Sequence, residues 1–284
     1  MNKLVWLVSY PKSGNTWFRM LMANYFNNSE KPIPLDKIES TPLSSSAIEF
    51  EEEMALNPFE LTMDEVDNYR PAFYRNLANS GLGESFFKKT HDAFTYNTNE
   101  EPIFPADISF GAVYFVRNPL DICVSYANYC ATKVEKMIMF ILNKKARVEG
   151  NKCGQLGQKL LSWDEHYKSW NEQDSIPIHS VRYEDMLQKP VETFGSIVKF
   201  LNLEYDEERL SRSITNSDFK LLRQMEKEQG FIERPRHCES FFWKGTIGNY
   251  RSYLSEDQIQ LIVNNFREVM LKLNYIDNKG NLTI

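Results

Sequence analysis

The stretch Leu4-Val5-Trp6-Leu7-Val8, followed by Ser9-Tyr10-Pro11-Lys12-Ser13-Gly14-Asn15-Thr16-Trp17, decides the fold. Its first part is a short, continuous apolar run, which is typical of a buried parallel strand. Its second part holds turn-forming residues and leads into a segment, 16–27, whose apolar side chains have helical spacing. The sequence therefore predicts a strand, a loop and a helix at the start of the chain.

The same pattern recurs along the chain. Three further strand candidates end in turn or polar residues: 85–89, 111–116 and 178–181. The last two lead into helical segments at 120–130 and about 191–201. Strands that alternate with helices indicate an α/β fold with a mainly parallel sheet. We expect one domain, 1–284, in which helices flank a central parallel sheet.

Composition and charge narrow the class of protein. The chain has 284 residues, of which 42% are hydrophobic and 25% charged, as expected for a globular domain. Lys and Arg total 33 against 39 for Asp and Glu, which gives a net charge of −6. This balance argues against a general nucleic-acid binder, which needs a basic face. It leaves room for a local anion pocket.

Cysteine spacing and hydropathy point to a cytoplasmic protein. The four cysteines are dispersed and form no CxxC pair, so neither a zinc knuckle nor a dithiol site is indicated: Cys123, Cys130, Cys153 and Cys238. We expect free thiols in a reducing compartment. We also expect no signal peptide and no membrane span, because no apolar run approaches the roughly 20 residues that a bilayer requires.

The loop after the first strand carries the chemistry of an anion site. A loop that enters a helix presents unpaired backbone N–H groups, and the helix dipole adds to their attraction for anions. Lys12 contributes a charge, and Ser13 and Thr16 contribute hydroxyl donors. The order GxxxxGK[ST] of a Walker A loop is absent. An ordinary strand-to-helix turn is the alternative interpretation.

A second anion contact is expected after the 111–116 strand. Arg117 follows the end of this strand, the edge at which ligands bind in open α/β sheets. Its guanidinium can hold a phosphate with two hydrogen bonds. Ser125 lies two turns into the following helix and can donate a hydroxyl. The alternative is a surface arginine that caps a turn.

Together these two strings resemble the sulfotransferases that use 3′-phosphoadenosine 5′-phosphosulfate (PAPS). Tyr-Pro-Lys-Ser-Gly-Asn-Thr-Trp, at 10–17, resembles the family's 5′-phosphosulfate loop, with Asn15 where Thr is usual. Arg-Asn-Pro-Leu-Asp, at 117–121, with Ser125 and Tyr126, resembles its 3′-phosphate motif. The resemblance runs from Leu4 to about Tyr253. It implies a three-layer, P-loop-like fold, and it is loose at 30–85 and 133–157. The prolines and aromatic residues of 30–85 indicate a helical insertion on the acceptor side, and the lysines and glycines of 133–157 indicate a variable, mobile segment.

The resemblance also implies catalytic residues. The string Lys88-Lys89-Thr90-His91 matches a family motif in which the histidine is the catalytic base. A histidine suits this role because its pKa lies near neutrality. Lys89 would stabilise charge on the transferring group, and Lys12 would neutralise the leaving phosphate oxygen. The other three histidines have no comparable setting and are expected to be structural: His166, His179 and His237.

The expected nucleotide contacts come from five segments. They are Lys12, Ser13, Gly14, Asn15, Thr16 and Trp17 of the loop, Arg117 and Ser125, Tyr183, Ser217 and Phe219, and Trp243, Lys244 and Gly245. Trp17 and Phe219 would lie against the adenine. Core packing is the alternative for each aromatic residue. Trp243 departs from the family pattern, because arginine usually holds its position and binds the 3′-phosphate. Arg234, Arg236 or Arg251 is expected to compensate.

We therefore expect a PAPS-dependent enzyme that transfers a sulfuryl group to a hydroxyl or amine, without a metal. The aromatic residues of 30–100 favour a small-molecule or glycoconjugate acceptor. Two alternatives stay open: a P-loop-type nucleotide kinase and a non-catalytic nucleotide-binding protein with the same fold. A homodimer also stays open, because residues 251–255 lack the Thr-Val dimer motif of some members.

Overall fold

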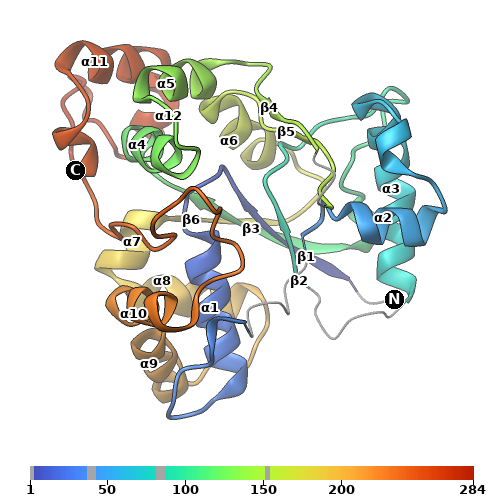
Figure 1. Ribbon diagram of the computed structural model, residues 1–284, viewed down its shortest axis with the longest axis horizontal. Helices are drawn as coiled ribbons and strands as arrows, with labels where there is room; N and C mark the ends of the chain where they lie inside the picture. The colour runs from blue at the N-terminus through green and yellow to red at the C-terminus, as the bar shows by residue number, and fades with distance from the viewer. Residues whose placement is uncertain (1–2, 37–42, 81–86, 151–153) are drawn as a thin grey trace. The chain divides into compact units, whose positions relative to one another are not determined.

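The computed structural model describes residues 3–36, 43–80, 87–150 and 154–284 (Figure 1). The chain forms two compact units, and separated segments contribute to each. The first unit comprises Met1–Tyr10, Thr41–Tyr114 and Asn143–Ser180. The second comprises Pro11–Ser40, Phe115–Leu142 and Val181–Ile284. The predicted single domain, 1–284, thus has two centres of packing.

The central sheet confirms the strands expected from the apolar runs. Its four strands have the order β2-β1-β3-β6: β1 (Leu4–Ser9), β2 (Phe87–Thr90), β3 (Ser109–Val116) and β6 (Ile178–Arg182). β1 and β2 are parallel, with Val5 opposite Phe87 and Val8 opposite Thr90. Every residue of β1 is buried, which explains why this strand is apolar from Leu4 to Val8. Residues 85–86 of the strand predicted at 85–89 lie outside the described residues.

The first unit also contains the helices of the predicted insertion. They are α2 (Ala47–Met54) and α3 (Met63–Ser80), with the 3-10 turns η2 (Pro58–Glu60) and η3 (Ala106–Ile108). The antiparallel pair β4 (Arg147–Val148) and β5 (Gln158–Lys159) and the helix α6 (Trp163–Asn171) complete it. Ser46 caps α2 by accepting a hydrogen bond from the Glu49 N–H group.

Many aromatic residues of the region 30–100 belong to the core of the first unit. Tyr74 stacks on Phe104 at 5.8 Å, and Phe94 contacts the Trp170 ring at 5.3 Å. Buried as well are Phe50 and Phe73, whose centroids are 5.3 Å apart. Exposed or partly exposed are Phe59, Tyr69, Phe87 and Tyr96, whereas Phe86 lies outside the described residues.

The second unit is helical. Its helices are α1 (Asn15–Asn27), α4 (Pro119–Tyr129), α5 (Val134–Leu142), α7 (Tyr183–Gln188), α8 (Pro190–Phe200), α9 (Glu207–Asn216), α10 (Phe219–Gln229), α11 (Glu256–Asn265) and α12 (Arg267–Lys272), with the 3-10 turn η4 (Asn249–Ser252). Phe18 of α1 packs between Phe115 and Phe194, with ring centroids 4.8 Å and 6.2 Å away. This packing explains the helical spacing of the apolar residues in 16–27.

Three other expectations concern local features. Within the segment predicted as variable, 133–157, α5 and β4 are ordered elements, and α5 buries Met137, Ile138 and Ile141. Cys123, Cys130 and Cys238 are free thiols, and Cys153 lies outside the described residues. Across the described parts of the chain, each helix is too short or too polar to span a bilayer.

Candidate active site

The loop between β1 and α1 has the backbone shape of an anion site. Two of its residues have positive φ angles, +71° for Lys12 and +99° for Gly14, and Gly14 immediately precedes α1. Within the described residues, the N-cap Gly14 makes no side-chain hydrogen bond to this helix start. The N–H groups and the dipole of a helix start attract anions. A Cβ atom at Gly14 would lie 2.7 Å from a ring carbon of Tyr183. Only glycine therefore fits between this loop and α7.

The Lys12 side chain lies between two aromatic rings. Its Nζ atom is 4.4 Å from the centroid of Tyr129 and 4.3 Å from that of Phe241. Each contact is a cation–π interaction, which stabilises an ammonium group by about 0.5–2 kcal/mol. The Lys12 side chain thus connects the loop between β1 and α1 to Tyr129 of α4 and to Phe241 of the 241–248 segment.

Arg117 links the anion loop to the 241–248 segment. Its side chain is buried, and its Nη1 atom donates to the Lys12 carbonyl oxygen at 3.0 Å. The Nη2 atom is 3.4 Å from the Thr246 carbonyl oxygen, and the guanidinium lies 4.2 Å from the centroid of Tyr183. Its Nε atom has no partner among the described residues. Arg117 was predicted to bind a phosphate. In the described part of the chain, its Nη atoms instead donate to two neutral carbonyl oxygens.

The predicted adenine contacts form an aromatic group in the second unit. The Trp17 ring lies edge-on to Tyr183 and Phe194, at 6.1 Å and 5.6 Å, and its Nε1 atom donates to the Ser217 carbonyl oxygen at 2.8 Å. The Ser217 hydroxyl accepts a hydrogen bond from Asn24 at 3.1 Å. Phe219 is 6.0 Å from Phe242, next to Gly245. Burial raises the pKa of Tyr183, and the nearby Arg117 charge opposes that shift.

Two carboxylates that sequence reasoning missed hold the 241–250 segment. Asp121 of α4 accepts hydrogen bonds from the Gly248 and Tyr250 N–H groups at 2.8 Å and 3.1 Å. Glu226 of α10 accepts from the Phe241 N–H group at 2.6 Å and the Phe242 N–H group at 3.0 Å. Asp121 lies inside the Arg-Asn-Pro-Leu-Asp string, so a signal was present, whereas Glu226 has none. These bonds set the path of the segment expected to bind phosphate.

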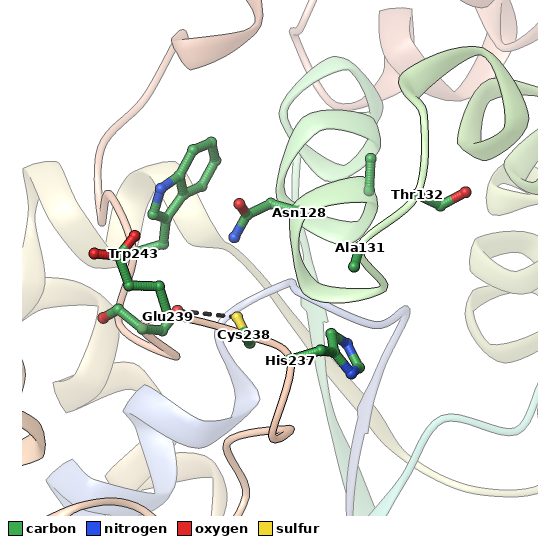
Figure 2. Close-up of a pocket in the computed structure, with 9 residues that line it drawn as sticks. Asn128, Ala131, Thr132, His237, Cys238, Glu239 and Trp243 are labelled. Carbon is green, nitrogen blue, oxygen red and sulfur yellow. Dashed lines mark hydrogen bonds between the residues drawn. The ribbon is translucent and has the colours of Figure 1, made fainter.

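Trp243 lines a pocket between α4 and the 237–243 segment. The pocket has a volume of about 340 Å³, and its lining residues are Ala127, Asn128, Ala131, Thr132, His237, Cys238, Glu239, Ser240 and Trp243. Figure 2 shows the Asn128 amide on the side of α4 that faces Trp243. The Trp243 ring also lies 5.7 Å from Tyr253 and 5.2 Å from the Lys244 Nζ atom. Ser125, one turn before Asn128 on α4, is half-buried.

A third carboxylate, Glu233, lies at the first turn of α1. It accepts a hydrogen bond from the Thr16 hydroxyl at 3.2 Å and from Arg19 Nη1 at 2.5 Å. Arg19 is buried, whereas Glu233 is partly exposed. A carboxylate therefore contacts a hydroxyl that was predicted to bind the nucleotide.

In the first unit, His91 follows β2 directly and its ring is fixed by Ser9. The His91 Nδ1 atom is 2.6 Å from the Ser9 carbonyl oxygen and 3.2 Å from the Ser9 hydroxyl. A carbonyl oxygen can only accept, so the Nδ1 atom carries a proton. The contact with Ser9 thereby fixes the orientation of the half-buried ring.

The two lysines before His91 have different surroundings. Both Lys88 and Lys89 are buried. The Lys88 ammonium pairs with both carboxylate oxygens of Glu49 at 3.1 Å. Neighbouring residues of a strand point to opposite faces, so Lys89 lies on the other face from this ion pair. Lys89 therefore lies on the side of β2 away from Glu49, and its predicted role stays a prediction.

Metal-ligating residues do not gather in the described residues. No group of three or more His, Cys, Asp or Glu side chains in those ranges could hold a metal ion.

Comparison with known proteins adds a family. The profile of the sulfotransferase domain matches residues 2–274. Luciferin sulfotransferase of Photinus pyralis is 23% identical over 266 residues, which cover 89% of this chain and 68% of that protein. Flavonol 3-sulfotransferase of Flaveria bidentis is 24% identical over 281 residues, with 91% and 78% covered. Cytosolic sulfotransferase 13 of Arabidopsis thaliana is 26% identical over 258 residues, with 88% and 71% covered.

Solved structures share the fold. A mouse sulfotransferase, SULT7A1, complexed with PAP superposes with a TM-score of 0.60 at 19% identity, and the match covers 94% of this chain and 84% of that one. Retinol dehydratase in a complex with retinol and PAP superposes with a TM-score of 0.61 at 20% identity, with 94% and 80% covered. At these identities the likeness supports the P-loop-like fold expected from the sequence.

Proposed function

The chain belongs to the sulfotransferase family, and we propose that it moves a sulfuryl group from PAPS to a small hydroxylated acceptor with His91 as the general base. Family membership makes it a PAPS-dependent sulfotransferase. The residues that act, and their roles, are our proposal. The observation that carries it is the orientation of His91, whose Nδ1 atom faces the Ser9 carbonyl oxygen.

The residues of the second unit fit a nucleotide with phosphate groups at both ends. The Ser13 hydroxyl and the Arg117 Nε atom are buried donors without a partner in the described ranges. A buried donor without a partner is costly, and a phosphate oxygen would satisfy it. We assign the 5′ end of PAPS to the loop 12–16 and its 3′-phosphate to Arg117, Ser125 and Lys244-Gly245. The rings of Trp17, Tyr183 and Phe219 would bind the adenine, with Ser217 and Trp243 beside them.

His91 would accept the proton of the acceptor. The acceptor oxygen forms a bond to sulfur while the bond from sulfur to the 5′-phosphate oxygen breaks. The acceptor proton passes to His91 Nε2, and the imidazolium keeps its Nδ1 proton on the Ser9 carbonyl oxygen. Ser9, whose carbonyl oxygen faces the His91 ring, is the last residue of β1, and the anion loop begins two residues later at Pro11. The proposed base and the proposed phosphate loop therefore both depend on this short stretch of chain.

Lys12 and Lys89 would supply positive charge. In a transfer of this kind, fixed charges stabilise the leaving phosphate oxygen and the transferring group. The Lys12 ammonium rests on Tyr129 and Phe241, so we propose that it leaves these rings when the donor binds. No metal is assigned a role.

The acceptor and the cellular setting complete the proposal. Flavonol and luciferin in the names of two relatives favour a small ring system with a hydroxyl group, and a glycoconjugate is the second acceptor class. We propose a cytoplasmic location, in line with the relative named as cytosolic. We further propose that 1–284 acts as one sulfotransferase domain, and a homodimer stays a possibility for sizing experiments.

Calorimetric titration with 3′,5′-bisphosphoadenosine, AMP and Mg-ATP tests the donor site. Micromolar binding of the bisphosphate, much tighter than that of AMP, supports the proposal. Preferential binding of Mg-ATP would favour the nucleotide-kinase alternative. If the bisphosphate does not bind, or binds no more tightly than AMP, the proposed recognition of the 3′-phosphate is contradicted.

Transfer from labelled PAPS to a panel of phenols, flavonoids and sugars tests the reaction. The variants His91→Ala and Lys12→Ala should each lose transfer by at least about a hundredfold. His179→Ala, at a partly buried histidine of β6 to which we assign no role, is the matched control and should keep wild-type activity. Full transfer by His91→Ala would overturn the assigned base. Nucleotide binding without transfer to any acceptor would favour the non-catalytic alternative.

A further inference from the structure

Three side chains of α6 hold the backbone just after β2. The His166 Nε2 atom lies 3.1 Å from the His91 carbonyl oxygen. The Trp170 Nε1 atom donates to the Asp92 carbonyl oxygen at 2.9 Å, and the Ser169 hydroxyl accepts from the Phe94 N–H group at 3.0 Å. All these groups belong to the first unit. The segment that carries the proposed base is thus attached to one helix at successive positions.

The protonation of His166 follows from its two partners. The His91 carbonyl oxygen can only accept, so the His166 Nε2 atom carries a proton. Its other ring nitrogen, Nδ1, is 2.7 Å from the Tyr114 hydroxyl, which donates to it. His166 and Tyr114 are buried, and burial lowers the pKa of His166 to about 4. The ring is therefore neutral near pH 7, with one donor and one acceptor, both used.

His91 is consequently held at two points. Ser9 fixes its ring through Nδ1, and His166 fixes its backbone through the carbonyl oxygen. Tyr10 packs edge-on against the His166 ring, at 5.4 Å and 80°, and limits its rotation. A base must be placed to within a fraction of an ångström for efficient proton transfer.

We propose that His166 is a positioning residue for His91: it donates from Nε2 to the His91 carbonyl oxygen and so fixes the base in its working orientation. This inference rests on the proposed function of His91. His166 itself touches no reacting atom. The sequence analysis expected only a structural role for His166, and the proposal adds the hydrogen bond that orients the base.

Two substitutions separate the positioning bond from packing. In His166→Gln the side-chain amide nitrogen takes the place of the imidazole Nε2 and can still donate to the His91 carbonyl oxygen. In His166→Asn the amide is shorter and reaches only the place of Nδ1, near Tyr114. Both variants lose the ring and its contact with Tyr10, so they match in lost packing.

Steady-state kinetics with saturating PAPS, together with thermal melting, provide the readout. We expect His166→Gln to keep kcat within about threefold of wild type and His166→Asn to lower it about ten- to a hundredfold. Binding of 3′,5′-bisphosphoadenosine should be unchanged in both. Equal loss of kcat in the two variants, at similar melting temperatures, would overturn the positioning role.

A measurement on the wild-type chain keeps the inference testable if a variant fails to fold. Nitrogen-15 NMR of the histidine rings should show His166 neutral and protonated on Nε2 at pH 7. A charged ring, or a proton on Nδ1, would overturn the inference. The variant His91→Ala separates this from the proposed function. If His91→Ala retains transfer, the proposed base is wrong. If His91→Ala loses transfer but His166→Gln and His166→Asn have the same kcat, only the role of His166 is refuted.

Discussion

The Glu233 carboxylate lies 3.2 Å from the Thr16 hydroxyl, at the helix start where the donor's phosphate is expected. Its second oxygen accepts from Arg19. The carboxylate thus accepts the hydrogen bond of the Thr16 hydroxyl, which was predicted to bind the nucleotide, and it adds negative charge beside the anion loop. A bound phosphate must displace this contact or share Thr16 with it.

Removal of this charge should therefore tighten nucleotide binding. We expect Glu233→Gln to lower the Kd for 3′,5′-bisphosphoadenosine about three- to tenfold in low salt, because like charges at short range repel. The gain should shrink as salt is added. Glu228→Gln makes the same change of charge on an exposed residue of α10 and serves as the control. Weaker binding by Glu233→Gln would mean that the carboxylate organises the site through Arg19.

Gly14 offers a test of the loop geometry. Gly14→Ala places a Cβ atom 2.7 Å from the Tyr183 ring at a φ of +99°, so both the contact and the backbone are unfavourable. We expect a loss of about 1–3 kcal/mol in unfolding free energy and at least tenfold weaker nucleotide binding, measured by denaturation and calorimetry.

Gly230→Ala is the matched control. Gly230 has a φ of +78°, but a Cβ atom there would meet nothing within 4 Å in the described residues. This variant should also lose stability, through backbone strain alone, and keep the wild-type Kd. If Gly14→Ala binds nucleotide as tightly as Gly230→Ala, the loop is not the donor site.

The buried His166 makes stability depend on pH. Its pKa is lowered to about 4 in the folded chain, against an ordinary value of 6.5. The unfolded chain therefore binds a proton between pH 6.5 and 4 that the folded chain refuses, and stability falls as pH falls through this window. We expect a loss on the order of 2 kcal/mol by pH 4.5 from this group.

Asp92 acts in the opposite direction within the same window. Burial raises its pKa to about 6, so its folded carboxyl binds a proton before the unfolded one does, and stability gains as pH falls. Urea unfolding at pH 7 and pH 4.5 separates the two groups. His166→Gln should lose less stability between these pH values than wild type, and Asp92→Asn should lose more. A His166→Gln curve parallel to that of wild type would refute the lowered pKa.

The strands and the anion loop could be predicted because their physics is local. A parallel strand buried on both faces is apolar throughout, so the run at 4–8 identifies β1 without any partner. The loop residues at 11–17 share one helix start. In the region 30–100 the sequence does not distinguish core from cleft, because an aromatic residue such as Tyr74 can pack in either place.

The partners of the site's carboxylates could not be predicted, because they are backbone atoms that are distant in sequence. Asp121 binds N–H groups at Gly248 and Tyr250, and Glu226 binds those of the 241–242 stretch. Any sequence supplies such N–H groups, so no residue pattern marks them. The contact made by His166 could not be predicted for the same reason, since its partner is a carbonyl oxygen of the chain.

Trp243 gives the sharpest test of how the donor is recognised. It stands at the position where the resemblance described above leads us to expect an arginine, and its ring packs near Tyr253. Trp243→Arg would add a charged donor beside the segment that Arg117 contacts. A charge-assisted hydrogen bond to phosphate contributes about 1.5–3 kcal/mol. We therefore expect the Kd for 3′,5′-bisphosphoadenosine to fall at least tenfold and the Kd for AMP to stay constant.

The control for this variant is Trp243→Phe, which keeps an apolar ring without adding charge. It should leave the ratio of the two affinities unchanged, since neither Trp nor Phe donates to a phosphate from the ring face. Calorimetry on wild type and both variants distinguishes the outcomes. If Trp243→Arg leaves the bisphosphate affinity as it was, another arginine, such as Arg251, already binds the 3′-phosphate. If both variants weaken AMP and the bisphosphate alike, Trp243 stacks on the adenine, and the altered residue is a nucleotide contact in its own right.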